Sequence, residues 1–329
     1  MAHSGERVAW IDWMKTLGIY FIIAGHCFGP GYKIVYAFSV PLFFVISGFL
    51  YKIESTVNEF LRKLFWNLIV PMLIYLLLNV LFNSLKHMLT DTFQVTYIYD
   101  GIKNGIFGRQ GENYASGGLG GMWFVYTLVL CKSLIKILPN KYRSICLIII
   151  NLVFLFLLQF YEQYLHTYNS FTNLVLAFPF FSIGYVLKHY KNEIHCLGVK
   201  DLFTLMPFAI LGLVISNRYN GIVFLYNCSY GGNLFMCFLG ALSGVVLIMA
   251  ISVLLGNLTS KLSRIIGGGT MIILGVHQYI ISFINHFVCP VSGIWLYIES
   301  IIILLMFVPM IRFANRCCPI LLGRYRSIE

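Results

Sequence analysis

The sequence predicts an all-α, polytopic membrane protein with about ten transmembrane helices and both termini in the cytoplasm. Its 329 residues are 59% hydrophobic and 11% charged, whereas soluble proteins carry about 25% charged residues. The sequence contains many apolar runs, and their lengths approach the roughly 20 residues that a helix needs to cross a bilayer. No alternation of apolar and polar residues is long enough to suggest a β-barrel.

Ten segments are expected to span the membrane, and short polar stretches separate them. They are residues 8–28, 34–51, 64–85, 120–138, 145–164, 173–187, 202–216, 232–255, 267–287 and 293–311. The sixth and seventh are short, which suggests a different tilt or a partly re-entrant course. Because there is no internal repeat, low-complexity tract or separate soluble domain, we expect residues 1–329 to form one transmembrane domain.

The distribution of Lys and Arg predicts the orientation. Of the 23 such residues, 18 fall on the side of the N-terminus, and five fall on the other side. Since positive charge is enriched in cytoplasmic loops, both termini are predicted to be cytoplasmic, in the inner (plasma) membrane of the cell. The net charge of +11 then reflects membrane topology, and no nucleic-acid partner is expected.

Two loops are predicted on the outer side. The first, residues 86–119, includes Asp91, Glu112 and Tyr114 and ends in a glycine run. The second, Arg218–Gly232, reads RYNGIVFLYNCSYGG and contains Tyr226 and Asn227. Tyr and Asn provide the stacking surfaces and hydrogen bonds that sugars use. The alternative is an ordinary interfacial loop with an aromatic belt.

The first predicted helix carries three ionisable side chains that a lipid-facing helix avoids: Asp12, Lys15 and His26. At 100° per residue, His26 lies about 20° from Lys15 and about 40° from Asp12, so all three project from one face. A charge near the bilayer centre costs several kcal/mol, so this face is predicted to line an interior and to be functional. His26 lies about 27 Å from Val8, towards the outer side. An imidazole suits a general base, although a histidine bonded to backbone carbonyls at a helix break is the alternative.

The spacing from Lys15 to His26 resembles the basic-x10-His signature of the acyltransferase 3 family of integral membrane acyltransferases. Residues 7–52 are similar to its sugar O-acetylases, the fucose 4-O-acetylase-like branch. The similarity is also clear at Trp123-Phe124 and Phe178–Lys188, and it is weaker at Thr270–Ile284 and Pro319–Arg324. The resemblance implies transfer of an acyl group, expected to be acetyl, from cytoplasmic acyl-CoA to a hydroxyl of a cell-surface or lipid-linked glycan.

The resemblance also implies that His26 is catalytic, as a general base or through a transient acyl-histidine. Many members carry Arg where this chain has Lys15. Lys15 lies about 16 Å from His26 along the helix, so it either pairs with Asp12 or attracts the anionic donor. The expected catalytic set is therefore His26, Lys15 and Asp12.

Coenzyme A carries phosphates that need basic partners, and Arg62, Lys63 and Arg264 are the candidate donor-binding residues. The positive-inside rule alone would place cations there too. There is no phosphate-binding glycine motif of the nucleotide-binding folds.

Five further residues are candidates to line the substrate site, and each has an alternative structural role. Ser47, beside Gly48, either borders a tunnel or allows close helix packing. Trp123 is a site residue or an interfacial anchor. His277 lines the cavity or is a core residue with satisfied hydrogen bonds, and the latter is favoured. Tyr226 and Asn227 represent the outer loop.

Two other function classes compete with the enzyme. Buried charges and broken helices also suit a proton-coupled transporter or flippase, although no repeated halves are visible. A structural subunit of an export complex would tolerate loss of His26. The nine cysteines show no metal-ligand spacing, so we expect free thiols and no metal. Membrane lipids are expected neighbours, and the oligomeric state is left open.

Overall fold

The computed structural model describes residues 9–90, 92–109, 118–256, 258, 260–287 and 292–324, and this part of the chain is built of helices. The only β-pairing in these ranges consists of two isolated bridges. The prediction of an all-α polytopic membrane protein is therefore confirmed.

The helices follow one another with short connections. In the first half they are α1 (Ala9–His26), α2 (Tyr32–Leu50), α3 (Val57–Leu64), the π-helical η1 (Phe65–Ile69), α4 (Val70–Leu89), α5 (Thr96–Ile106), η3 (Gly120–Met122), α6 (Trp123–Ile137), η4 (Asn140–Tyr142) and α7 (Arg143–Leu165). In the second half they are α8 (Ser170–Leu187), η5 (Lys188–Tyr190), α9 (Lys191–His195), α10 (Val199–Tyr219), η6 (Leu225–Asn227), α11 (Leu234–Leu255), α12 (Lys261–Gly268), α13 (Thr270–Phe287), α14 (Trp295–Cys317) and η7 (Pro319–Leu322).

Each of the ten predicted spans falls on a helix, but not every one of these helices is long and apolar enough to cross a membrane. Within the described ranges, eight helices are long and apolar enough to cross a membrane, and the bent pair α12–α13 would make nine. α1 is not among them, because Asp12, Lys15 and His26 make its 18 residues more polar. The seventh span, expected to be short, is the 21-residue α10.

Four short helices have no counterpart in the prediction: α3, α5, α9 and α12. α5 lies within the outer loop 86–119 and packs on α4, where a Cβ on Gly105 would meet Leu76. Asp91, Glu112, Tyr114 and Gly117 of that loop lie outside the described residues. What the structure describes of this loop is therefore a helix and its flanking turns.

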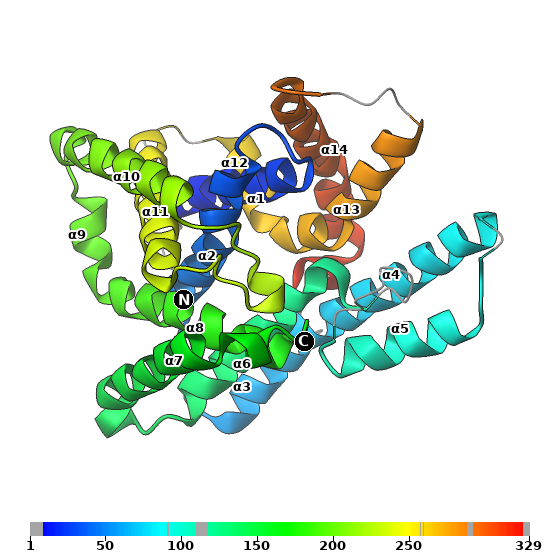
Figure 1. Ribbon diagram of the computed structural model, residues 1–329, viewed down its shortest axis with the longest axis horizontal. Helices are drawn as coiled ribbons and strands as arrows, with labels where there is room; N and C mark the ends of the chain where they lie inside the picture. Colours follow the sequence, from blue (N-terminus) through cyan, green and yellow to red (C-terminus); the bar gives the residue numbers. More distant parts are fainter. Residues whose placement is uncertain are drawn as a thin grey trace.

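α1 runs through the middle of the molecule, between α10–α11 on one side and α13–α14 on the other (Figure 1). It contacts α2, α11, α12, α13 and α14. Ile19 and Ile23 are completely buried, and even Asp12 is buried. The polar face of α1 thus looks at protein, as its charges require.

A close helix crossing joins α2 to α8 through two glycines. A Cβ on Gly48 would lie 2.0 Å from the carbonyl oxygen of Phe181, and one on Gly184 would lie 2.0 Å from that of Val45. Only glycine fits at such a distance, so small residues set the approach of the two helices. The expected close packing at Ser47-Gly48 is found at Gly48.

A sharp bend separates α12 from α13. The two helices meet at 80° around Gly269. A Cβ on Gly269 would lie 2.4 Å from Ile311 of α14, so the bend also depends on a glycine. α13 then packs against α1 and α14 and carries His277 into the core.

Candidate functional site

A cavity of about 470 Å³ opens beside the N-terminal half of α1, among the ends of α2, α3, α6 and α13. This volume falls in the range of small-molecule sites. Its walls combine apolar side chains, with Phe43, Phe124 and Leu128 among them, and polar ones, which include four lysines and one acidic residue, Glu54. The lysines come from four different segments: Lys15, Lys52, Lys63 and Lys132.

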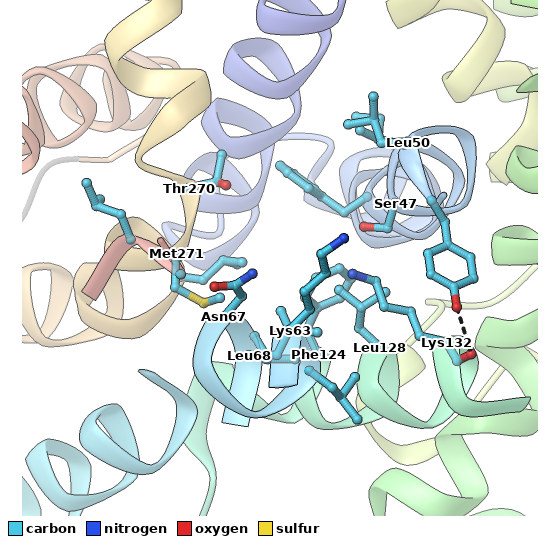
Figure 2. A pocket seen from close by; sticks show the side chains of 18 of the residues that line it. Ser47, Leu50, Lys63, Asn67, Leu68, Phe124, Leu128, Lys132, Thr270 and Met271 are labelled. Atoms are coloured by element: carbon cyan, nitrogen blue, oxygen red, sulfur yellow. Dashed lines mark hydrogen bonds between the residues drawn. The ribbon is translucent and has the colours of Figure 1, made fainter. Parts of the chain in front are cut away.

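Two of these lysines reach towards the middle of the cavity from different helices, as Figure 2 shows for Lys63 and Lys132. The Lys63 ammonium forms an ion pair with Glu59 at 2.7 Å, and its side chain is 50% exposed. The Lys132 ammonium lies 5.7 Å from the centre of the Tyr51 ring. The cavity therefore combines apolar walls with concentrated positive charge, which suits an anionic ligand with an apolar arm.

A π-helical segment, η1, forms another wall of the cavity. The widened turn Phe65–Ile69 interrupts the helix between α3 and α4. Asn67 and Leu68 from this segment line the cavity. Single π-turns inside α-helices are rare and frequently occur at functional sites, so this irregularity marks the wall independently of the lysines.

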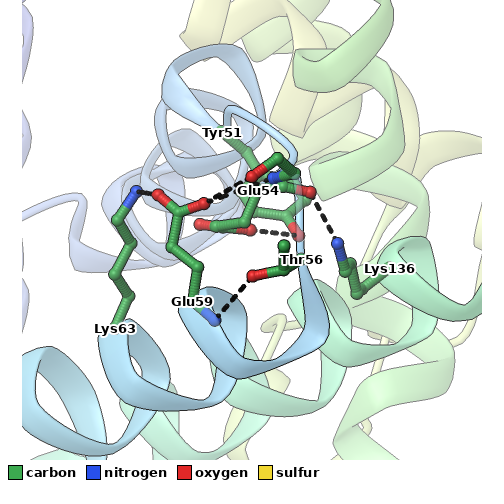
Figure 3. A network of polar contacts seen from close by, with 7 residues as sticks. Tyr51, Glu54, Thr56, Glu59, Lys63 and Lys136 are labelled. Atoms are coloured by element: carbon green, nitrogen blue, oxygen red, sulfur yellow. Dashed lines mark hydrogen bonds and ion pairs between the residues drawn. The ribbon is translucent and has the colours of Figure 1, made fainter.

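A polar network holds the segment after α2, which supplies Lys52 (Figure 3). Lys136 donates to the carbonyl oxygen of Glu54 at 2.6 Å, and Lys188 donates to that of Tyr51 at 2.8 Å. Burial, with the Glu54 carboxylate nearby, raises the pKa of the Tyr51 phenol. The phenol therefore stays protonated and can donate a hydrogen bond.

At the other end of α1, two histidines face each other. The ring centres of His26 and His277 are 5.0 Å apart. Nδ1 of His277 lies 2.8 Å from the carbonyl oxygen of Ile273, one turn earlier in α13. A carbonyl can only accept, so the proton is assigned to Nδ1, and Nε2 keeps a lone pair. Nε2 is buried and has no hydrogen-bond partner in the described ranges.

This geometry revises the favoured interpretation of His277. A core histidine with satisfied hydrogen bonds would use both ring nitrogens, whereas His277 uses one and directs the rest of its ring to His26. Neither histidine borders the cavity, but Leu274, one turn before His277, does. The histidine pair and the cavity are thus neighbouring features joined along α13.

The three polar residues of α1 have different surroundings. Lys15 lines the cavity. Asp12 packs against α12, where a Cβ on Gly267 would lie 3.5 Å from its carboxylate. His26 contacts His277 and, at 6.0 Å between ring centres, Tyr36.

Other predicted residues divide between the cavity wall and positions outside it. Ser47 and Lys63 line the cavity. Arg62 and Arg264 are exposed and are not on this wall. Trp123 packs edge-on against Phe124 at 6.4 Å, and it is Phe124 that reaches the cavity. The donor-binding roles of Arg62 and Arg264 stay predictions.

Tyr226 and Asn227 lie in η6, in the loop between α10 and α11. The Tyr226 backbone accepts a hydrogen bond from Asn173 of α8 at 2.8 Å. Its ring contacts those of Phe224 and Tyr168. Oδ1 of Asn227 is buried and lacks a hydrogen-bond partner in the parts of the chain described.

Sequence reasoning missed Lys52, Lys132, Asn67 and Tyr36 as site residues. Lys132 carried a usable signal, because it lies inside the predicted span 120–138, and a cation within a span usually faces a functional interior. The positive-inside rule also accounts for Lys132, so its position within a span was not taken as a sign of a site. Nothing in the sequence marks the π-turn that places Asn67.

Comparison with known proteins gives one match. The sequence profile of a family described as an acyltransferase domain matches residues 8–312. Searches of curated proteins and of solved structures give no significant match.

Proposed function

The chain belongs to the acyltransferase 3 family, and on this premise we propose that it transfers an acetyl group from cytoplasmic acetyl-CoA to a hydroxyl of a cell-surface or lipid-linked glycan. The family establishes a multi-pass membrane acyltransferase, so the enzyme prediction is confirmed over the transporter and the structural subunit. The acetyl donor, the glycan acceptor, the fucose 4-O-acetylase-like branch and the inner (plasma) membrane are the proposed refinements.

The observation that carries the proposal is the arrangement along α1: a lysine-lined cavity at one end and a histidine pair at the other. Lys15 belongs to the first and His26 to the second, about 16 Å apart along the helix. The end with the cavity is the one that the charge distribution assigns to the cytoplasm. This order matches a donor that enters from the cytoplasm and an acceptor on the outer side.

The cavity supports acyl-CoA as the donor. Coenzyme A has a charged part, with a diphosphate and a 3′-phosphate, and an uncharged arm that ends in the thioester. Lys52, Lys63 and Lys132 would hold the phosphates, because ammonium groups are effective phosphate partners. Apolar walls such as Phe124 and Leu128 would hold the arm.

His26 would act as the general base. The acceptor hydroxyl oxygen attacks the thioester carbonyl carbon while a nitrogen of His26 takes the hydroxyl proton. The tetrahedral intermediate then breaks the carbon–sulfur bond, and the sulfur leaves with the proton from His26. The products are the acyl ester and free coenzyme A.

His277 supports this role by its fixed tautomer. Its lone pair on Nε2 can accept an N–H from His26, which would orient the second nitrogen of His26 towards the hydroxyl. Lys15 and Asp12 would act at a distance from the reacting atoms, Lys15 through the donor and Asp12 through the packing of α1 on α12.

The test is transfer of radiolabelled acetyl from acetyl-CoA to the cell-envelope glycan in membranes. His26→Ala should lower transfer by about 10²- to 10⁴-fold, compared at matched protein level. His87→Ala, which changes a half-buried histidine at the end of α4, away from the histidine pair and the cavity, is the control and should transfer like wild type. Equal transfer by His26→Ala would overturn the general base. Absence of labelling by wild type, with acetyl and with succinyl donors, would overturn the donor and acceptor.

A second measurement separates direct transfer from an acyl-histidine. Wild type incubated with acetyl-CoA and no acceptor is quenched, digested and analysed by mass spectrometry. Direct transfer predicts that the peptide of His26 is unmodified. An acetylated His26 that disappears when the glycan is added would replace the general base with covalent catalysis.

A further inference from the structure

Six aromatic side chains form a continuous set of ring contacts that begins at His26. We call this set the aromatic array; its members are Phe28, Tyr32, Tyr36, Tyr168, Phe224 and Tyr226. Tyr36 contacts His26 at 6.0 Å, and it also contacts Phe28 at 6.4 Å and Tyr32 at 6.0 Å. From Tyr36 the contacts continue to Phe224 at 5.4 Å, Tyr226 at 5.5 Å and Tyr168 at 5.8 Å.

The array is an accessible surface and not part of the core. Phe28 is 61% exposed, and the other five side chains are partly exposed. The rings come from three segments: the turn before α2 with the first turns of that helix, the connection between α7 and α8, and the loop between α10 and α11. All six side chains are neutral, and four carry a phenol hydroxyl, so the surface offers apolar faces and hydrogen-bonding groups together.

The loop that carries Phe224 and Tyr226 is held rigidly. The backbones of Phe224 and Ser229 exchange two hydrogen bonds, of 2.9 and 3.0 Å. The Asn220 side chain bonds to Tyr230 and Asn233 at 2.9 and 3.0 Å and closes the base of the loop. Val223, Leu225 and Cys228 are buried beneath it. A binding surface held in this way loses little entropy on binding.

Backbone strain is concentrated at the same place. Among the residues described, three other than glycine have positive φ: Phe28 at 55°, Tyr168 at 50° and Cys228 at 60°. Such a conformation is uncommon for large side chains and costs energy, and it clusters at functional sites. Two of the three carry rings of the array, and the third closes the loop that carries two more.

From these observations we infer that the aromatic array is the acceptor subsite and that it binds a neutral glycan of several sugar units. This inference rests on the proposed function. The unit to be acylated would lie at His26 and Tyr36, and the following units would lie along Phe224, Tyr226 and Tyr168. Sugar rings present C–H faces that pack on aromatic rings, and their hydroxyls bond to phenols and amides. The buried Oδ1 of Asn227 would accept one such bond.

The length of the array indicates a ligand of several sugar units, and its lack of charge indicates a neutral one. Three successive ring contacts lead from Tyr36 to Tyr168, so a single sugar would cover only one end. A lipid-facing aromatic belt would consist of separate side chains around the circumference. Here the rings contact one another, and the set ends at the histidine pair.

The test uses purified protein in nanodiscs, acetyl-CoA, and mild-acid fragments of the producing cell's own surface polysaccharide, sorted by size. Wild type should show an acceptor KM that falls as the fragments grow from one sugar unit to several. Tyr226→Ala and Tyr168→Ala should raise the KM of long fragments by about threefold to tenfold each, the range for one lost ring contact. Their KM for the single unit and for acetyl-CoA should stay at the wild-type value.

Two further variants sharpen the test. Tyr226→Phe keeps the ring and removes the hydroxyl, so it should recover most of the affinity for long fragments if stacking dominates. Tyr219→Ala changes an exposed tyrosine at the end of α10, outside the array, and should behave like wild type. Folding of every variant is checked by thermal unfolding of the purified protein.

Different results separate failure of the inference from failure of the proposed function. If wild type acetylates fragments of all sizes with one KM, or if the array variants keep the length dependence, the array is not the subsite. If wild type acetylates no fragment, the proposed function fails, and binding of the fragments without donor decides the array. If longer fragments bind more tightly and Tyr226→Ala weakens that binding, the assignment of the array as the acceptor subsite is supported. If binding does not depend on fragment length, the assignment is overturned.

Discussion

The two ends of α1 present contrasting surfaces. Around Lys15, the cavity carries four lysines on apolar walls. Around His26, the neighbours are His277 and uncharged aromatic rings. A separation of 11 residues, about 16 Å along the helix, therefore divides a surface suited to an anion from one suited to a neutral ligand. One helix can position both because the protein buries it on most sides.

The two surfaces are also built differently. Helices supply most of the cavity wall, whose irregular feature is the π-turn η1. Turns, loops and the first turns of α2 supply the aromatic array, whose irregular features are three strained residues. Helix-borne charges suit a donor of constant structure, and loop-borne rings are easily changed without disturbing the packed helices.

The largest expected effect comes from a change that should damage both surfaces together. α2 borders the cavity at Ser47 and carries Tyr36 of the array, and Gly48 fixes its crossing with α8. Gly48→Ala would place a methyl group 2.0 Å from a backbone oxygen, so it should lower the unfolding free energy by about 3 kcal/mol or more. Denaturant unfolding in mixed micelles measures this, and donor and acceptor binding should fall together.

Gly25→Ala is the matched control for this substitution. Its methyl group would lie 3.4 Å from Val35, at ordinary contact distance. Alanine is also favoured over glycine in helices by up to about 1 kcal/mol, so stability should be unchanged or higher. Equal stability of Gly48→Ala and wild type would show that α2 and α8 do not depend on this crossing.

The next effect should separate the two surfaces. Lys132 reaches the cavity from α6 and contacts the Tyr51 ring. Lys132→Met keeps the length of the side chain and removes the charge. A bond to a charged group contributes about 1.5–3 kcal/mol, so the KM for acetyl-CoA should rise by about 10- to 100-fold. The acceptor KM should not change, because the array lies at the other end of α1.

Lys141→Met removes an exposed charge beyond the end of α6, outside the cavity, and is the control for Lys132→Met. Its donor KM should match wild type. The assignment of the cavity to the donor would be contradicted if Lys132→Met raised only the acceptor KM, or if both lysine variants changed the donor KM equally.

The sequence was sufficient to predict most of the fold. Hydrophobic runs placed all ten helical segments, because burial in lipid or protein demands apolar residues over about the same length. It also singled out α1, since Asp12, Lys15 and His26 are costly anywhere but in a protein interior. The short helices α3, α5, α9 and α12 were missed, because they do not follow the length of a membrane span.

The site was predictable only where a single element carried the signal. Lys15 and Ser47, which their own helices marked as candidates, both line the cavity, and their roles stay predictions. The meeting of His26 with His277 depends on the bend at Gly269, and the contact of Tyr36 with Phe224 depends on a distant loop. Such contacts between remote segments leave no local pattern. Arg62 and Arg264 do not line the cavity, because a cytoplasmic cation need not face it, and their donor-binding roles stay predictions.

A substitution of His277 should have a smaller effect, and it tests the role of the histidine pair at the outer end of α1. If its lone pair orients His26, His277→Ala should lower kcat by about tenfold, the loss of one hydrogen bond to the base. The KM values for donor and acceptor should stay unchanged, because neither the cavity wall nor the array is altered. His277→Gln, which keeps a hydrogen-bond acceptor, should recover part of kcat. A rise in the donor KM with kcat intact would place His277 in donor binding instead.

The smallest expected effect is that of a substitution of Lys63. It tests whether the burial of a cavity lysine determines how much that lysine contributes to donor binding. Lys63 lines the same cavity as Lys132, but its side chain is 50% exposed and is already paired with Glu59. Exposed ion pairs contribute little, so Lys63→Met should raise the donor KM by about threefold or less. Glu59→Gln should lower it, because the ammonium then interacts with the donor alone. Both effects should fade as salt screens the charges, whereas that of Lys132→Met should persist, and equal salt sensitivity of the two lysine variants would contradict the distinction.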